Sequence, residues 1–160
     1  MSGSPSKNTV VIPAPFGSVS LVFANQQLIA CELSYRKPRS KTPDSPDYAR
    51  SSVRAVDNYF HSANLRQRVP MQIHGTDFQK RVWTALQAIP PGETATYGEI
   101  AAKLGSGARA VANACRQNPL PLFIPCHRVV AAKGMGGFMG QTSGKELGIK
   151  RWLLRHEAAH

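Results

Sequence analysis

The 160-residue chain has few acidic residues, few cysteines and no long apolar run, and each shortage excludes a class of protein. Three cysteines, Cys31, Cys115 and Cys126, are too few for a disulfide framework or a four-cysteine zinc site, which predicts a reducing, cytoplasmic location and no metal. No apolar run approaches the ~20 residues of a membrane helix. The first residues also lack the apolar stretch of a secretory signal. We therefore expect no membrane association.

Basic residues, in contrast, are abundant. The chain carries 20 Lys and Arg against 9 Asp and Glu, a net charge of +11, and both halves share the excess. Such a charge favours a polyanionic partner, and nucleic acid is the first choice. With 42% hydrophobic residues the chain can bury a core, so a globular fold is predicted. We predict two domains, residues 1–73 and 74–160.

The amino-terminal domain is predicted to be a small β-sheet with one helix. Three strand-like stretches occur at residues 10–12, 17–23 and 28–33, with alternation of polar and apolar residues clearest from Ser18 to Leu21, and together they predict a three-stranded meander. The stretch that begins at Arg36 and ends at Pro46 is rich in Lys, Arg, Ser and Pro, and is predicted to be a flexible loop. Helical spacing follows at residues 48–60.

The carboxy-terminal domain is predicted to be mainly helical, which assigns the whole chain to the α/β (α+β) class. Capping boxes at Thr76 and Thr96 indicate two helix starts, and the second helix is expected to cover residues 97–104. A glycine-containing turn then leads to a third helix at residues 108–117, which makes a helix-turn-helix candidate. The polar side chains of this third helix, which favour DNA binding, fall on one face: Arg109, Asn113, Arg116 and Gln117.

One segment, Pro-Cys-His-Arg at residues 125–128, carries chemistry that packing does not require. The histidine and the arginine beside Cys126 can both lower the pKa of its thiol and favour the thiolate, which is the nucleophilic form. The preceding proline would fix the backbone that aims the side chain. Cys31, in an alternating strand, and Cys115, on the buried stripe of a helix, are interpreted as structural.

Further motifs accompany this segment, and together they span residues 75–157. They are, in order, Gly-Thr-x-Phe-Gln-x-x-Val-Trp from Gly75, Ile-Pro-x-Gly-x-x-x-x-Tyr from Ile89, Arg-Ala-Val from Arg109, Asn-Pro from Asn118, Ile-Pro-Cys-His-Arg-Val-Val from Ile124 and Lys-x-Trp-Leu-Leu-x-His-Glu from Lys150. In order and number they resemble the motifs of the methylated-DNA–protein-cysteine methyltransferases, also called O6-alkylguanine-DNA alkyltransferases. Residues 1–73 resemble that family only loosely.

The resemblance implies a DNA-repair enzyme that acts once per molecule, moving an alkyl group from the 6-oxygen of guanine to its own cysteine, irreversibly and without a cofactor. On this sequence the nucleophile is Cys126, His127 takes its proton through a water, and Glu157 orients His127. Sulfur is a strong nucleophile toward saturated carbon, and the thioether product is too stable to regenerate the thiol. The alternative for Glu157 is an exposed glutamate in a last helical turn.

The resemblance also implies a partner, duplex DNA that contains O6-alkylguanine, bound by a monomer. The helix-turn-helix would enter the minor groove, and the damaged base would leave the stack at a cost of a few kcal/mol. Arg109 would fill the vacated space, or make a simple phosphate contact, and Tyr97 would contact the phosphate and the base. The expected DNA contacts are Tyr97, Arg109, Ala110, Asn113 and Arg116. The expected residues of the base pocket are Asn118, Pro121, Arg128, Val129, Phe138 and Met139. Asn118 would brace the active-site loop, or be a simple turn residue before Pro119, and for Pro121, Val129 and Phe138 core packing is the alternative.

Two departures from the family pattern leave questions open. Residues 133–145 form a longer segment than is common, so the size of the adduct that fits is not predicted, and Ala112 stands where glycine is usual. The sequence disfavours three other functions. A non-catalytic lesion-binding relative would lack Cys126, a helix-turn-helix regulator would not need Pro-Cys-His-Arg, and a Cys-His hydrolase should show an oxyanion-hole loop.

Overall fold

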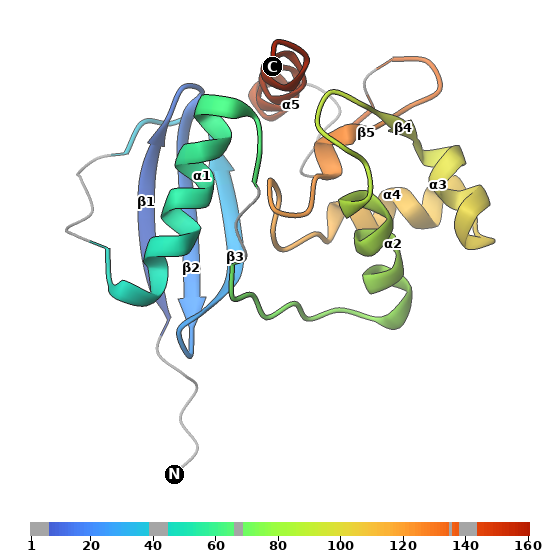
Figure 1. Ribbon diagram of the computed structural model, residues 1–160. Coiled ribbons are helices and arrows are strands. Elements are labelled where there is room, and N and C mark those ends of the chain that lie inside the picture. Colours follow the sequence, from blue (N-terminus) through green and yellow to red (C-terminus); the bar gives the residue numbers. More distant parts are fainter. Residues whose placement is uncertain (1–6, 39–44, 66–68, 135, 138–143) are drawn as a thin grey trace. The chain divides into compact units, whose positions relative to one another are not determined.

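The computed structural model describes residues 7–38, 45–65, 69–134, 136–137 and 144–160. The chain divides into two compact units, Met1–Ile73 and His74–His160 (Figure 1). Strands and helices are both present, which confirms the predicted α+β class. Among the described residues, no helix combines the length and the apolar character needed to cross a membrane.

The first unit contains a three-stranded antiparallel sheet in the order β1-β2-β3. The strands are β1 (Asn8–Ala14), β2 (Gly17–Ala24) and β3 (Gln27–Ser34), so the predicted meander is confirmed. The hairpin between β2 and β3 turns at Asn25 and Gln26, whose φ values of 50° and 63° lie in the left-handed region that such tight turns require.

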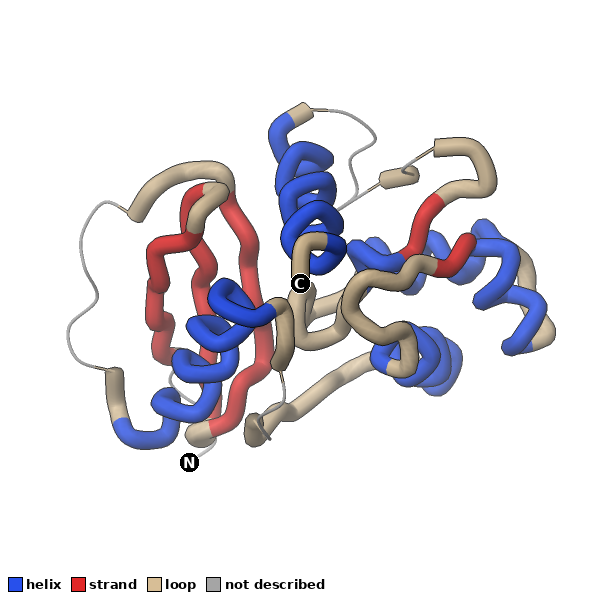
Figure 2. Tube along the Cα trace, turned by 45° about the horizontal axis from the view of Figure 1, so that its top comes forward, coloured by secondary structure: helices blue, strands red, loops and turns tan. Residues whose placement is uncertain are grey.

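One helix lies across a face of this sheet (Figures 1 and 2). A 3₁₀ turn, η1 (Asp47–Ala49), leads into α1 (Arg50–Ser62), so the α-helix itself begins slightly later than the spacing predicts. Within the predicted loop, residues 39–44 lie outside the described part of the chain. The core of the unit is formed by apolar side chains from β2, β3 and α1, among them Val19, Leu21, Phe23, Leu28, Val56 and Tyr59.

The second unit is mainly helical and adds a short parallel pair of strands. Its elements are, in chain order, α2 (Asp77–Gln87), β4 (Ala95–Thr96), α3 (Tyr97–Leu104), α4 (Ala108–Arg116), η2 (Cys126–Arg128), β5 (Val129–Val130) and α5 (Lys145–Ala158). Ala95 pairs with Val129 and Thr96 with Val130. This pairing places the segment that follows the candidate nucleophile beside the start of α3.

Both predicted capping boxes are confirmed. The Thr76 Oγ1 accepts a hydrogen bond from the Gln79 N–H at 3.1 Å, and the Gln79 Oε1 accepts one from the Thr76 N–H at 2.9 Å. Thr96 and Glu99 form the same reciprocal pair at 3.0 and 3.1 Å. Because Tyr97 is the first residue of α3, the second box fixes the backbone of a predicted site residue.

Helix α2 supports the helix pair α3–α4. The indole Nε1 of Trp83 donates to the Ala114 carbonyl of α4 at 2.9 Å in the interior. From the same helix, Arg81 Nη2 donates to the Leu104 carbonyl at the carboxyl end of α3 at 3.2 Å. These two hydrogen bonds attach both helices of the predicted helix-turn-helix to α2.

Candidate active site

The segment that leads to Cys126 is held by one asparagine. Asn118 Nδ2 donates to the Ile124 carbonyl at 2.9 Å, and Asn118 Oδ1 accepts from the Leu120 N–H at 2.9 Å. Between Leu120 and Ile124, the buried Leu122 has a φ of 81°, a backbone conformation that L residues rarely adopt. The hydrogen bonds of Asn118 hold this strained turn in place and present Cys126 at the first position of η2.

Burial dominates the chemistry of the Cys126 thiol. The residue is only 8% exposed, and desolvation raises the pKa of Cys126 above the ordinary thiol value. A hydrogen bond from Asn118 and the positive charge of Lys150 oppose this rise, in that order. The thiol is therefore protonated at neutral pH and needs a base before it can attack carbon.

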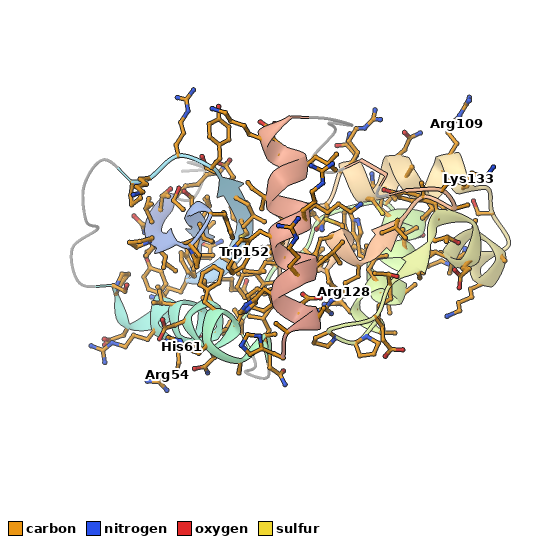
Figure 3. All side chains as sticks on the ribbon, turned by 90° about the horizontal axis from the view of Figure 1, so that it is seen from above. Arg54, His61, Arg109, Arg128, Lys133 and Trp152 are labelled. Atoms are coloured by element: carbon orange, nitrogen blue, oxygen red, sulfur yellow. The ribbon has the colours of Figure 1, made fainter. Side chains whose placement is uncertain are left out.

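The role of Arg128 differs from the one that its position in the sequence suggests. The sequence predicts that its guanidinium lowers the pKa of the Cys126 thiol. Instead Nε donates to Glu157 Oε1 at 2.8 Å, Nη2 to Glu157 Oε2 at 3.0 Å, and Nη1 to the Ile89 carbonyl at 2.7 Å. Arg128, which lies beside α5 in Figure 3, holds the Glu157 carboxylate by a two-pronged contact.

His127 is oriented by the same carboxylate. Its Nε2 lies 2.5 Å from Glu157 Oε2, and both side chains are fully buried, so Glu157 is not an exposed terminal-turn residue. Burial lowers the pKa of His127, and this effect outweighs the opposing one of Glu157, so the ring is neutral at pH 7. A neutral ring that donates from Nε2 carries its lone pair on Nδ1. No hydrogen bond to Nδ1 occurs within the described residues, which leaves this nitrogen able to accept a proton.

Tyr97, at the start of α3, lies close enough to the candidate nucleophile Cys126 to interact with it electrostatically. Its hydroxyl makes a long hydrogen bond, 3.5 Å, to the Gly137 carbonyl. Gly136 lies against the ring, since a Cβ there would come within 3.0 Å of the Tyr97 Cε2. Burial raises the pKa of Tyr97 to about 12, and the thiols of Cys115 and Cys126 add to the rise. Tyr97 therefore keeps its proton and can act as a hydrogen-bond donor.

Sequence reasoning gave no role to one buried side chain, that of Lys150. It is fully buried, and its Nζ donates to the Val129 carbonyl at 2.7 Å and to the Gly137 carbonyl at 2.8 Å. Desolvation lowers the pKa of Lys150 to about 8, against the opposing effect of the nearby thiols. A signal was available in the sequence, because four buried residues of α5 recur at helical spacing: Leu147, Lys150, Leu153 and Glu157.

The expected DNA contacts of α4 lie on one surface. Arg109, Asn113 and Arg116 are exposed and Ala110 is half-buried. Figure 3 shows the Arg109 side chain projecting away from the body of its unit. Arg109, Asn113 and Arg116 follow one another at spacings of four and three residues, which places them on a single helical face, and Ala110 lies at its edge.

The other expected site residues fall into two groups. Pro121 and Val129 are buried and Asn118 is half-buried, whereas Phe138 and Met139 lie outside the described residues.

The described residues contain no cluster of His, Cys, Asp and Glu that could hold a metal ion. Cys115 is half-buried, not fully buried as its place in the helix suggested, and desolvation raises its pKa to about 12.

Comparisons with known proteins agree on one family. The model of the 6-O-methylguanine DNA methyltransferase DNA-binding domain matches residues 77–159. The chain is 36% identical over 155 residues to the methylated-DNA–protein-cysteine methyltransferase of Methanosarcina acetivorans, a match that covers 93% of this chain and 97% of that protein.

Solved structures give the same result. The Mycobacterium tuberculosis O6-methylguanine methyltransferase superposes with a TM-score of 0.79 at 33% identity, over 96% of this chain and 94% of that one. The structure of Mycobacterium tuberculosis OGT in complex with DNA gives a TM-score of 0.77 at 36% identity, over 94% and 92%. Matches of this extent show that the chain belongs to the methylated-DNA–protein-cysteine methyltransferases, the DNA-binding alkyltransferases of DNA repair.

Proposed function

We propose that the protein moves an alkyl group from the 6-oxygen of guanine in duplex DNA to the Sγ of Cys126, once per molecule. The observation that carries this proposal is the hydrogen bonding of the neutral His127 ring. Glu157 binds its Nε2, and its Nδ1 is without a hydrogen-bond partner in the described part of the chain. A neutral imidazole held in this way is a general base suited to the adjacent thiol, which burial keeps protonated.

The transfer balances without a cofactor. The thiol proton passes to His127 Nδ1, through a water as the family resemblance implies. The sulfur then forms a bond to the alkyl carbon, the bond from that carbon to the 6-oxygen breaks, and guanine keeps the electron pair and regains a proton. Glu157 stabilises the imidazolium that forms, as a carboxylate does for histidine in other nucleophilic sites, and Arg128 holds that carboxylate.

For DNA binding, we propose that the protein acts as a monomer and that α3 and α4 enter the minor groove. The damaged base is flipped toward Cys126. The exposed Arg109 would fill the vacated space, while Asn113 and Arg116 would contact the backbone. Small residues at Ala110 and Ala112 allow a close approach of the helix to the groove. Tyr97, near the nucleophile, would contact both the phosphate and the extruded base.

Intact-protein mass spectrometry tests the transfer. After incubation with one equivalent of duplex that contains O6-methylguanine, we expect a mass gain of one CH2 unit, mapped to Cys126 by peptide analysis. Cys126→Ser should gain nothing, and Cys31→Ser, the matched control, should react like wild type. Label on another cysteine, or repaired DNA in excess of protein, would contradict the proposal. DNA binding without any label would favour the non-catalytic alternative.

A further inference from the structure

Lys150 of α5 reaches the backbone at two points of the chain that precedes this helix. Among its contacts, its Nζ donates to the Val129 carbonyl, three residues after Cys126, and to the Gly137 carbonyl. Placing an ammonium group in a protein interior is costly unless hydrogen bonds compensate it. The two contacts, at 2.7 and 2.8 Å, show that this lysine is used as a cross-link.

Both ends of this cross-link lead to Tyr97. On one side, Val129 pairs with Ala95 in β4, and β4 runs directly into Tyr97 at the start of α3. On the other side, the Gly137 carbonyl that accepts from Lys150 also accepts from the Tyr97 hydroxyl. Gly136, with a φ of 75°, lies so close to the ring that a Cβ would come within 3.2 Å of the hydroxyl oxygen.

We propose that Lys150 is a positioning residue for Tyr97, because it fixes the Gly136–Gly137 support against which the tyrosine ring lies. The inference rests on the proposed function, in which Tyr97 contacts the phosphate and the extruded base. Lys150 touches neither DNA nor the alkyl group in this account. It acts by keeping the Tyr97 ring in the orientation that receives the guanine.

The first test separates positioning from the effect of the Lys150 charge on the thiol. Lys150→Met keeps most of the side-chain volume and removes the donors, and Arg151→Met, an exposed neighbour on α5, is the matched control. Two single-turnover rates at Cys126 are measured, one with free O6-methylguanine base and one with iodoacetamide, which needs no guanine orientation. We expect the ratio of the first rate to the second to fall at least about ten-fold in Lys150→Met and to stay unchanged in Arg151→Met. An unchanged ratio in Lys150→Met would show that Lys150 acts on the thiol alone.

A second readout does not depend on alkyl transfer. The chain has 4 tyrosines, so 3-fluorotyrosine labelling gives few fluorine resonances, and Tyr97→Phe assigns that of Tyr97. In Lys150→Met this resonance should shift and broaden, whereas in Arg151→Met it should match wild type. An unmoved Tyr97 resonance would overturn the inference even if transfer occurs. A displaced resonance without transfer would leave the inference standing and count against the proposed function.

A third variant guards against misfolding of Lys150→Met. Gly136→Ala leaves Lys150 intact but places a methyl group 3.0 Å from the Tyr97 ring at a backbone conformation that alanine adopts with strain. It should lower the same rate ratio and move the same fluorine resonance. If neither quantity changes in Gly136→Ala, the Gly136–Gly137 support does not position Tyr97, and the inference fails.

Discussion

At the residue scale, burial acts on the two reacting groups in opposite directions. It raises the pKa of the Cys126 thiol and lowers the pKa of the His127 ring, because in each case the charged form loses its hydration. Both groups therefore rest in their neutral forms at pH 7. Transfer of a proton from sulfur to nitrogen creates an ion pair, and the Glu157 carboxylate at 2.5 Å from Nε2 stabilises its positive half.

The pH dependence of transfer should reflect this arrangement. An ordinary histidine is protonated below a pKa of about 6.5, but the pKa of His127 is lowered, so the ring stays a base when the pH falls through that value. The single-turnover rate should hold through pH 6.5 and decline only in more acidic solution.

In His127→Asn the rate at pH 7 should fall at least about 100-fold, with DNA affinity within a few-fold of wild type. Equal losses of rate and affinity would mean that His127 is structural.

A buried hydroxyl in the first unit gives a prediction about stability. Ser52 is fully buried in α1, and in the described part of the chain its Oγ has no hydrogen-bond partner. Removing such a group relieves a desolvation cost, so Ser52→Ala should raise the free energy of unfolding by about 1 kcal/mol. Urea denaturation of Ser52→Ala and of the half-buried control Ser51→Ala measures the difference. A loss of stability in Ser52→Ala would show that the hydroxyl is satisfied.

At the scale of elements, α4 has two exposed arginines, Arg109 near its start and Arg116 at its end. A phosphate contact and a group that replaces a flipped base differ in their effect on chemistry. Loss of a phosphate contact weakens DNA binding and reduces the salt slope by about one unit. Loss of the group that fills the stack slows reaction with duplex but leaves reaction with the free base intact.

Arg109→Ala should therefore change a ratio of rates. We expect the single-turnover rate with duplex O6-methylguanine to fall at least about ten-fold, or ~1.4 kcal/mol in the barrier, while the rate with free O6-methylguanine base stays near that of wild type. Both rates are measured at saturating substrate. In Arg116→Ala, the matched control, the ratio of duplex to free-base rate should not change. If Arg109→Ala also keeps the wild-type ratio, Arg109 is one more phosphate contact.

Local chemistry made some elements predictable and others not. The starts of α2 and α3 follow from side chains three residues apart, so Thr76 and Thr96 identify them without knowledge of the fold. The β4–β5 pair was missed because two-residue strands show no alternation. The partners of Arg128 and Lys150 were missed because they lie at least 13 residues away in sequence, where adjacency to Cys126 gives no guidance.

At the scale of the whole molecule, the described site belongs to the second unit, His74–His160. Its members come from separate elements of that unit: Tyr97 from α3, Cys126, His127 and Arg128 from η2, and Lys150 and Glu157 from α5. Each of these side chains is partly or fully removed from solvent. A net charge of +11 favours long-range attraction to DNA, and the chemistry is proposed for the buried cluster.

The most direct test of alkyl transfer to Cys126 follows the methyl carbon itself. Duplex DNA with a ¹³C-labelled methyl group on the 6-oxygen of guanine is mixed with the protein in two experiments. The protein is in excess in the first, and the DNA is in excess in the second. Carbon NMR should show the oxygen-bound methyl signal replaced by a sulfur-bound one on Cys126, and with excess DNA the conversion should stop at one methyl per protein molecule. Labelled methanol, or conversion that continues beyond one equivalent, would identify a hydrolase and contradict the account.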